Sequence, residues 1–155
     1  MVREIEFRVK TATEGILFSH LLACNTNFTP PLSEKVDLAK YSKKIFDNAI
    51  TFEAWKNEIL VGLVAAYYND PSHHSGFITN VSLIREFMGK GIATSLISHC
   101  IDYGRYSDFS EILLEVQKSN TAARKLYKTA GFVDIGSQSE NILMKLCLKT
   151  AKRVI

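Results

Sequence analysis

Residues 88–100 read MGKGIATSLISHC and constrain the fold more than any other stretch of the chain. Two glycines and a lysine stand directly in front of a helical apolar pattern, so a loop with little side-chain cover leads into a helix. The first turn of a helix leaves backbone N–H groups without partners, and together with the helix dipole they favour an anion by about 0.3–2 kcal/mol. The segment therefore indicates either an anion site or a tight turn that holds no ligand.

Two common phosphate-binding loops fit this stretch poorly. A P-loop requires Ser or Thr directly after its lysine, whereas Lys90 is followed by Gly91. The dinucleotide fingerprint requires a third glycine where Thr94 stands, and it normally opens its fold. The helix after the loop should lie on a sheet through an apolar stripe. That stripe contains Ile92, Ala93, Leu96, Ile97, Cys100 and Ile101.

The order of strand-like and helix-like segments predicts one α/β (α+β) domain over residues 1–155, with a mixed central β-sheet flanked by about four helices. In the first expected strand, Ile5, Phe7 and Val9 alternate with polar residues, so one face should be half-buried. Strands are expected over residues 3–10, twice within 49–70 around a turn at 56–58, and over 73–84, 111–117, 132–136 and 141–149. Helices are expected over residues 13–24, 36–49, 92–106 and 120–130.

Composition places the chain among ordinary globular proteins and argues against two classes of partner. Hydrophobic residues make up 46% of the chain and charged residues 23%, and the formal net charge is +3. The nearest approach to a basic run is KTAKRV at residues 149–154, which is too short to indicate nucleic-acid binding. No apolar run approaches the roughly 20 residues that cross a bilayer, so no membrane partner is expected.

The cysteines and the N-terminal segment favour a reducing compartment. Cys24, Cys100 and Cys147 are widely spaced in apolar surroundings, and their odd number fits reduced core thiols better than disulfides. Their spacing matches no metal-ligand pattern, so no metal is expected. The first residues, MVREIEF, are charged and lack the apolar region of a signal peptide. We therefore expect a cytoplasmic protein.

A second pattern, LLEVQKSNTAARKLYKTAGF at residues 113–132, completes a resemblance that covers about residues 77–132. The two patterns in this order resemble the Gcn5-related N-acetyltransferase (GNAT) superfamily. Its loop, Gln/Arg-x-x-Gly-x-Gly/Ala, corresponds here to residues 88–93, and Met88 stands where Gln or Arg is usual. Its Asn-x-x-Ala-x-x-Leu-Tyr-x-x-x-Gly-Phe pattern corresponds to Asn120, Ala123, Leu126, Tyr127, Gly131 and Phe132.

The resemblance implies that the anion is the pyrophosphate of acetyl-coenzyme A (acetyl-CoA). Backbone N–H groups in the loop and the Thr94 hydroxyl would hold it, and Lys90 would add positive charge. The backbone of Val81 and Leu83 would pair with the pantetheine arm as a neighbouring strand does. The residues that this reading assigns to the loop are Met88, Gly89, Lys90, Gly91, Ile92, Ala93 and Thr94.

The resemblance also implies a role for two residues of the second pattern. Tyr127 would act as general acid toward the departing thiolate of coenzyme A, although a tyrosine at helical spacing more commonly fills a core. Asn120 would orient the thioester arm, and a helix N-cap is its structural alternative. The backbone N–H of Leu83 would polarise the acetyl carbonyl.

Glu115 is the candidate general base, because LEVQKSN is similar to the Leu-Glu-Val-Arg-x-Ser-Asn stretch of bacterial ribosomal-protein N-terminal alanine acetyltransferases. The alternative is a solvated carboxylate at the end of a strand. The histone-modifying branch of the superfamily places a glutamate where this chain has Phe77, so that base is missing here.

The predicted function is acetyl transfer from acetyl-CoA to a primary amine by direct attack, without a covalent enzyme intermediate. The acceptor stays open among a small amine, an amino sugar, an amino acid and a protein or peptide N-terminus. A homodimer through the last strands is possible. The alternative is a non-catalytic module that binds acyl-CoA as a sensor or scaffold.

Overall fold

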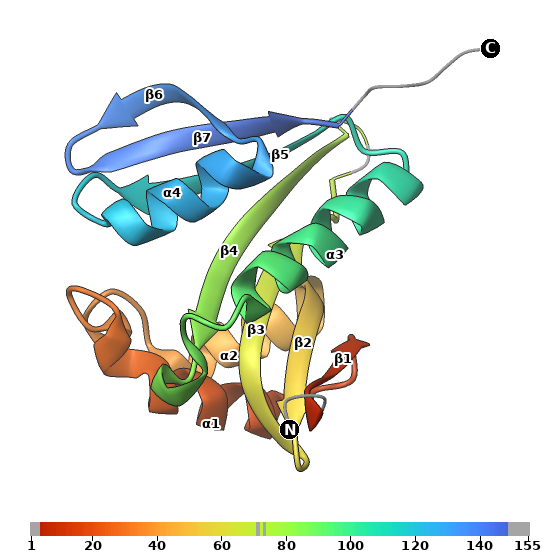
Figure 1. Cartoon of the computed structure of the whole chain (residues 1–155), viewed down its shortest axis with the longest axis vertical. Helices are drawn as coiled ribbons and strands as arrows, with labels where there is room; N and C mark the ends of the chain where they lie inside the picture. Colours follow the sequence, from red (N-terminus) through yellow and green to blue (C-terminus); the bar gives the residue numbers. More distant parts are fainter. Residues whose placement is uncertain (1–3, 71, 73, 149–155) are drawn as a thin grey trace.

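A computed structural model describes residues 4–70, 72 and 74–148, so the KTAKRV run lies outside the described residues. Seven strands and four α-helices alternate in the order that the sequence predicts (Figure 1). The strands are β1 (Glu6–Val9), β2 (Ile50–Lys56), β3 (Ile59–Tyr67), β4 (Ser75–Leu83), β5 (Glu111–Gln117), β6 (Val133–Gln138) and β7 (Asn141–Cys147). The helices are α1 (Glu14–Cys24), α2 (Leu38–Asn48), α3 (Ile92–Tyr106) and α4 (Thr121–Ala130). Three short 3-10 turns are η2 (Asn25–Asn27), η3 (Leu32–Glu34) and η4 (Arg85–Phe87).

The helix ends follow from local chemistry that the sequence displays. The side chains of Thr13, Asp37 and Asn120 accept backbone N–H groups at the starts of α1, α2 and α4. Gly131 ends α4 in the left-handed conformation, with φ of 111°, which a residue with a Cβ atom adopts at a cost. The helix α3 differs from the others, because its N-cap is Gly91 and no side chain caps it.

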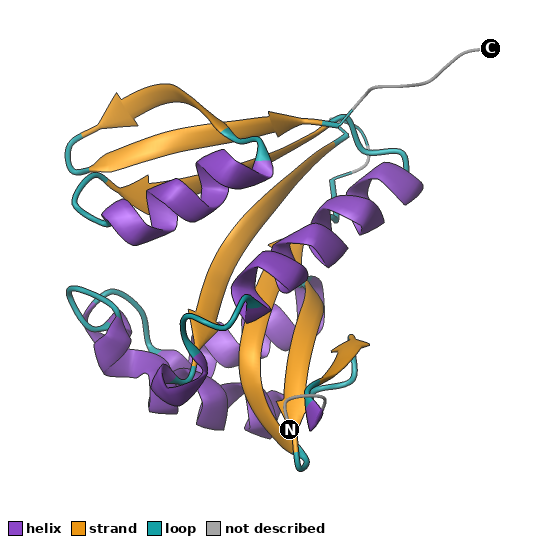
Figure 2. Ribbon diagram, viewed as in Figure 1, coloured by secondary structure: helices purple, strands orange, loops and turns teal. Residues whose placement is uncertain are grey.

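The strands form one mixed sheet in the order β1-β2-β3-β4-β5-β7-β6, in which only the β4–β5 pair is parallel (Figure 2). Apolar residues of α1 and α2 pack in one cluster with β2 and β3, and those of α3 and α4 pack in another with β2 to β5 and β7. The sheet therefore has an apolar core on each face, as an α/β layer architecture requires.

The parallel pair β4–β5 comes apart halfway along the sheet. Its register runs only from Ser75 opposite Glu111 to Ile78 opposite Leu114, although β4 continues to Leu83 and β5 to Gln117. Figure 1 shows the two strands starting side by side and separating toward their C-terminal ends. Both strands therefore carry backbone groups without a neighbouring strand at the centre of the sheet, where an edge is otherwise rare.

Two expectations about burial are wrong. Phe7 and Val9 in β1 are 40% and 48% exposed, because β1 is the edge strand and α3 covers it only in part, through an edge-on contact of the Phe7 ring with His99 at 5.2 Å between centroids. Cys147 at the end of β7 is exposed, whereas Cys24 and Cys100 are buried free thiols. Among the described residues, no helix combines the length and the apolar character that a membrane crossing requires.

Candidate active site

A cleft of about 870 Å³ occupies the gap between β4 and β5. One wall is the segment from Asn27 to Lys35 together with the end of β4. The other wall combines the start of α3, the end of β5 and the inner side of α4. The cleft therefore brings together the two sequence patterns, at residues 88–94 and 114–127, that are far apart along the chain.

The start of α3 offers backbone donors to this cleft. Gly89 and Gly91 have φ of 77° and 84°, in the left-handed region, and a Cβ atom at either position would meet no neighbour within 4 Å. The first bond that closes the helix runs from the Ser95 N–H to the Gly91 carbonyl at 3.1 Å. In the described part of the chain, the N–H groups of Ile92, Ala93 and Thr94 thus donate to no acceptor, and an anion would satisfy them.

The unpaired half of β4 also turns backbone groups toward the cleft. The Ile84 N–H donates to the Val61 carbonyl at 2.9 Å, on the β3 side. Because N–H groups alternate sides along a strand, those of Val81 and Leu83 point the opposite way, where β5 has separated. The Leu83 carbonyl on this side already accepts a hydrogen bond from Asn27 Nδ2 at 3.1 Å. The structure thus leaves the Val81 backbone and the Leu83 N–H for a ligand.

Tyr127 lies on the inner side of α4 and lines the cleft with 7% of its surface exposed. Its ring contacts Phe132 edge-on, with 6.0 Å between centroids, and no described residue hydrogen-bonds its hydroxyl group. Burial raises the pKa of Tyr127 to about 12. The residue thus fills the core, as the structural alternative held, and also lines the cleft.

Asn120 and Glu115 also line the cleft. Asn120 caps α4, because its Oδ1 accepts the Ala123 N–H at 3.1 Å. Glu115 is exposed on one face of β5, while Leu114 and Val116 are buried on the other, as the alternation in the sequence predicts. No described side chain forms an ion pair with the Glu115 carboxylate, so its position fits either a base at the cleft or a solvated side chain.

A buried polar chain reaches the cleft from α1 and was not found from the sequence. His20 is 3% exposed, with Nδ1 at 3.0 Å from the Leu60 carbonyl and Nε2 at 2.9 Å from Ser82 Oγ. Ser82 Oγ also lies 2.7 Å from the side-chain amide of Asn80, and both Ser82 and Asn80 line the cleft. Because a carbonyl only accepts, a neutral His20 carries its proton on Nδ1. Apart from helical spacing, nothing in the sequence marks this histidine.

A β-bulge brings a further polar pair to the same wall. Asn80 is opposite Ala65 and Ile78 is opposite Ala66, so Thr79 has no partner on β3. The Tyr41 hydroxyl from α2 donates to the Thr79 carbonyl at 2.8 Å. Consecutive residues, Thr79 and Asn80, thus both contact the α1–α2 side, which makes this stretch of β4 polar but uncharged.

We expect His20 to make the protein less stable in mild acid. Burial lowers the pKa of folded His20 to about 4, whereas an unfolded histidine titrates near 6.5. Between these values the unfolded chain binds a proton that the folded chain does not. The free energy of unfolding should therefore fall by about 1.4 kcal/mol for each pH unit from 6.5 toward 4. Urea unfolding at several pH values measures this slope. The H20Q variant should show a shallower slope, and identical slopes for both proteins would contradict the assignment.

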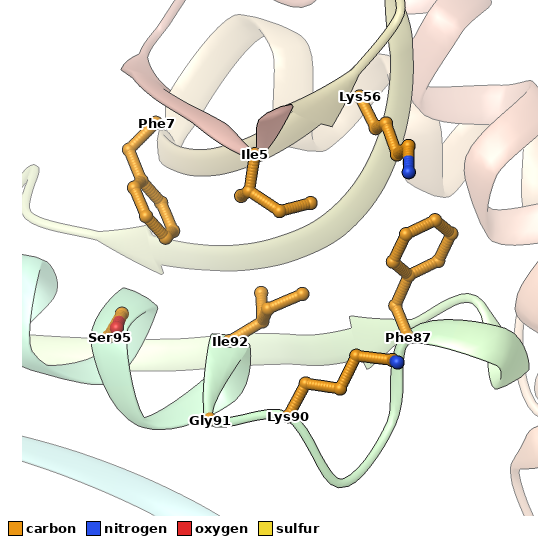
Figure 3. Close-up of a pocket in the computed structure, with 8 residues that line it drawn as sticks. All are labelled: Ile5, Phe7, Lys56, Phe87, Lys90, Gly91, Ile92 and Ser95. Carbon is orange, nitrogen blue, oxygen red and sulfur yellow. The ribbon is translucent and has the colours of Figure 1, made fainter. Parts of the chain in front are cut away.

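A second, smaller pocket of about 280 Å³ lies on the other side of the start of α3 (Figure 3). Phe7 and Ile5 of the N-terminal region face Ile92 across it, and Lys90 extends toward Phe87. Lys90 therefore belongs to the glycine loop, but its side chain lines this pocket and not the cleft. In this structure the backbone N–H groups, more than the lysine, supply the positive potential at the cleft.

No three His, Cys, Asp or Glu side chains in ranges 4–70 and 74–148 are grouped so as to hold a metal ion. The cleft combines backbone donors at a helix start, an unpaired strand edge, a buried tyrosine and one carboxylate. Such an arrangement can bind a long ligand with an anionic group and act on a group near Tyr127.

The chain is similar in sequence to known proteins. A model of the acetyltransferase (GNAT) family matches residues 17–132. A spermidine N(1)-acetyltransferase of Vibrio cholerae is 31% identical over 148 residues, which cover 88% of this chain and 84% of that protein. The N-acetylaspartate synthetase of Rattus norvegicus is 28% identical over 95 residues, which cover 61% of this chain and only 31% of that protein.

Solved structures show the same fold at low sequence identity. The ribosomal-protein-S18-alanine N-acetyltransferase from Escherichia coli superimposes with a TM-score of 0.77 and 16% identity, over 97% of this chain and 98% of that one. Similar folds have also been crystallised with coenzyme A and with acetyl-CoA.

Proposed function

Because the chain belongs to the acetyltransferase (GNAT) family, we propose that it transfers an acetyl group from acetyl-CoA to a primary amine. We also propose that residues 1–155 act as one domain for this reaction. The relatives named above act on different acceptors, so they support an amine acceptor in general and not a particular one. The observation that carries the proposal is the cleft, where the unpaired edge of β4 connects the glycine loop with Tyr127.

The residues of the cleft fit acetyl-CoA. The free N–H groups at the start of α3 suit a pyrophosphate, and the N–H groups of Val81 and Leu83 suit the amides of a pantetheine arm. Thr94 and Met88 line the same part of the cleft. When bound, acetyl-CoA supplies an activated acetyl group as a thioester. The Leu83 N–H would polarise its carbonyl.

In the proposed reaction the amine attacks the acetyl carbonyl directly, and Tyr127 assists the departure of the thiolate. A pKa of about 12 keeps its hydroxyl protonated at neutral pH. Full proton transfer to a thiolate, whose acid has a pKa near 8.5, would cost about 5 kcal/mol. Tyr127 would therefore donate a hydrogen bond to the developing charge, and the proton itself would come from the amine.

Glu115 would take a different proton, the one that the acceptor ammonium loses to become a neutral amine before it attacks. The proton that reaches the thiolate is then released from the same nitrogen after the attack. An amine with a pKa near that of lysine is neutral in only about one molecule in two thousand at pH 7, which adds roughly 4–5 kcal/mol to the barrier. We expect the E115Q variant to lower kcat/KM by about tenfold at pH 7 and by less at pH 9.5, where more of the amine is already neutral. A pH profile of kcat/KM measures this. A loss that is independent of pH would remove Glu115 as the base.

The alternative function is a non-catalytic acyl-CoA sensor, which would bind the coenzyme without transfer. A thiol-release assay with acetyl-CoA against a broad panel of amines distinguishes the two, with isothermal titration of acetyl-CoA as the parallel measurement. We expect binding and transfer to at least one amine. Binding without transfer to any amine would favour the sensor, and an absence of binding would overturn both.

A further inference from the structure

Few charged side chains line the cleft, and the positive and the negative one lie on opposite walls. Of the described residues that line it, Lys35 carries the one positive side chain and Glu115 the one negative side chain. Lys35 lies on the α1–α2 wall, and Glu115 lies on β5 across the gap. The wall between them, at Thr79, Asn80 and Ser82, is polar and uncharged.

The charge of Lys35 is not neutralised within the described part of the protein. No salt bridge or hydrogen bond joins its ammonium group to a described residue, and the side chain is exposed at the cleft. A second cation adjoins the same wall, because the Arg85 guanidinium donates to Asn27 Oδ1 at 2.7 Å. Lys35 is therefore the cation that can meet an anionic group of a ligand inside the cleft, while the acidic residues nearest to it in sequence, Glu34 and Asp37, do not line the cleft.

The segment that carries Lys35 is held in place by hydrogen bonds to two parts of the structure. Asn25 Oδ1 accepts the Ser33 N–H at 2.7 Å, and Asn25 Nδ2 donates to Ser33 Oγ at 3.0 Å, so η2 and η3 are joined. Asn27 Nδ2 ties the segment to β4 through the Leu83 carbonyl, and Leu32 is 8% exposed within the core. Lys35 thus follows directly from an anchored turn, which limits where its ammonium group can reach.

The two charges decide between classes of acceptor. A polyamine carries two or more ammonium groups, and in this cleft it would find one carboxylate and a repelling lysine. An amine that also carries a carboxylate would find a partner of opposite charge for each group, and such charge complementarity gives specificity more than affinity. A neutral amine would leave Lys35 without a partner.

Resting on the proposed function, we propose that the acceptor is a small amino acid or another amine that carries a carboxylate. Lys35 binds the carboxylate, and Glu115 receives the ammonium at the point where the unpaired edge of β4 faces Tyr127. Lys35 is then a specificity residue, and it takes no part in the chemical step.

Matched acceptors that differ in the carboxylate test this class directly. We would compare alanine with alaninamide, and 2,4-diaminobutyrate with 1,3-diaminopropane, and include spermidine as a polycation. The carboxylate member of each pair should have a kcat/KM higher by about tenfold or more. Equal or better transfer to the amides, to the diamine or to spermidine would overturn the proposal.

The K35Q and K35E variants assign the preference to this side chain. The K35Q variant should raise KM for the carboxylate acceptors by about tenfold and leave kcat and the alaninamide KM nearly unchanged. The K35E variant should abolish or reverse the preference within each pair. Lys40, exposed on α2 and outside the cleft, supplies the matched control, because the K40Q variant should behave like the natural protein.

Equilibrium binding separates this proposal from the proposed function. Titration of 2,4-diaminobutyrate into the protein saturated with coenzyme A should give a Kd that the K35Q variant raises by about tenfold, whether or not transfer occurs. The Kd of acetyl-CoA should be the same for both proteins. If the K35Q variant raised the Kd of acetyl-CoA and left the Kd of the acceptor unchanged, Lys35 would belong to the coenzyme site. That result would overturn the proposal.

Discussion

The Y127F variant should lower kcat by about 100-fold or more, because it removes the hydroxyl group that we propose as the hydrogen-bond donor to the leaving thiolate. The ring stays, so its edge-on contact with Phe132 and its place in the core are kept. The Kd of acetyl-CoA should therefore change by less than about twofold. Pre-steady-state thiol release and isothermal titration give the two numbers separately.

The matched control for this variant is Tyr106, which is 93% exposed at the end of α3. The Y106F variant also removes one hydroxyl group, and it should leave kcat unchanged. Because the pKa of Tyr127 is raised to about 12, activity should also persist well above pH 9 without a loss due to this residue. A Y127F variant with full turnover would exclude the hydroxyl from the mechanism.

The G91V variant should weaken acetyl-CoA binding by about 100-fold or more. Gly91 has φ of 84°, which a β-branched residue adopts only under strain, although the space around its Cα is open. The loop must therefore shift and carry the free N–H groups at the start of α3 out of alignment. Losing two hydrogen bonds to a charged group accounts for an effect of this size.

Gly136 supplies the control for G91V. It lies in β6, its φ is outside the left-handed region, and a Cβ atom there would also meet nothing within 4 Å. The G136V variant should thus keep the affinity for acetyl-CoA. Circular dichroism of both variants shows whether the fold is intact. A folded G91V protein with normal affinity would refute the proposed pyrophosphate site.

The sequence predicts the elements well because their signals are local. Thr13, Asp37 and Asn120 cap helices within three residues of themselves, and Gly131 ends α4 through its own backbone conformation. The turn between β2 and β3 is equally local, since Asn57 and Glu58 adopt left-handed φ values. The mixed sheet with four flanking helices is confirmed for the same reason.

Features that depend on distant partners could not be predicted. The burial of His20 depends on Leu60 and Ser82, which are 40 and 62 residues away. The exposure of Phe7 depends on the position of β1 at the edge of the sheet, and alternation alone does not reveal which strand is an edge. Similarly, the end of β7 leaves Cys147 exposed despite its apolar neighbours in sequence.

In the candidate site too, the features with a local sequence signal could be predicted, and those that depend on distant residues could not. The glycine loop and the α4 pattern carry their own sequence signal, and the structure brings both to one cleft. The direction of the Lys90 side chain depends on Phe87 and the N-terminal region, and the hydrogen bond from Asn27 to the Leu83 carbonyl depends on how η2 packs against β4. The spacing of residues in the sequence predicts where such residues lie, but it does not predict the directions of their side chains.

The most direct test of the whole account is a crystal structure of the protein with bound coenzyme A. We expect the pyrophosphate within hydrogen-bonding distance of the backbone N–H groups of residues 91–94, the pantetheine arm along Val81 and Leu83, and the thiol beside the Tyr127 hydroxyl. A ligand in the smaller pocket near Phe7, or one whose thiol lies away from Tyr127, would contradict it.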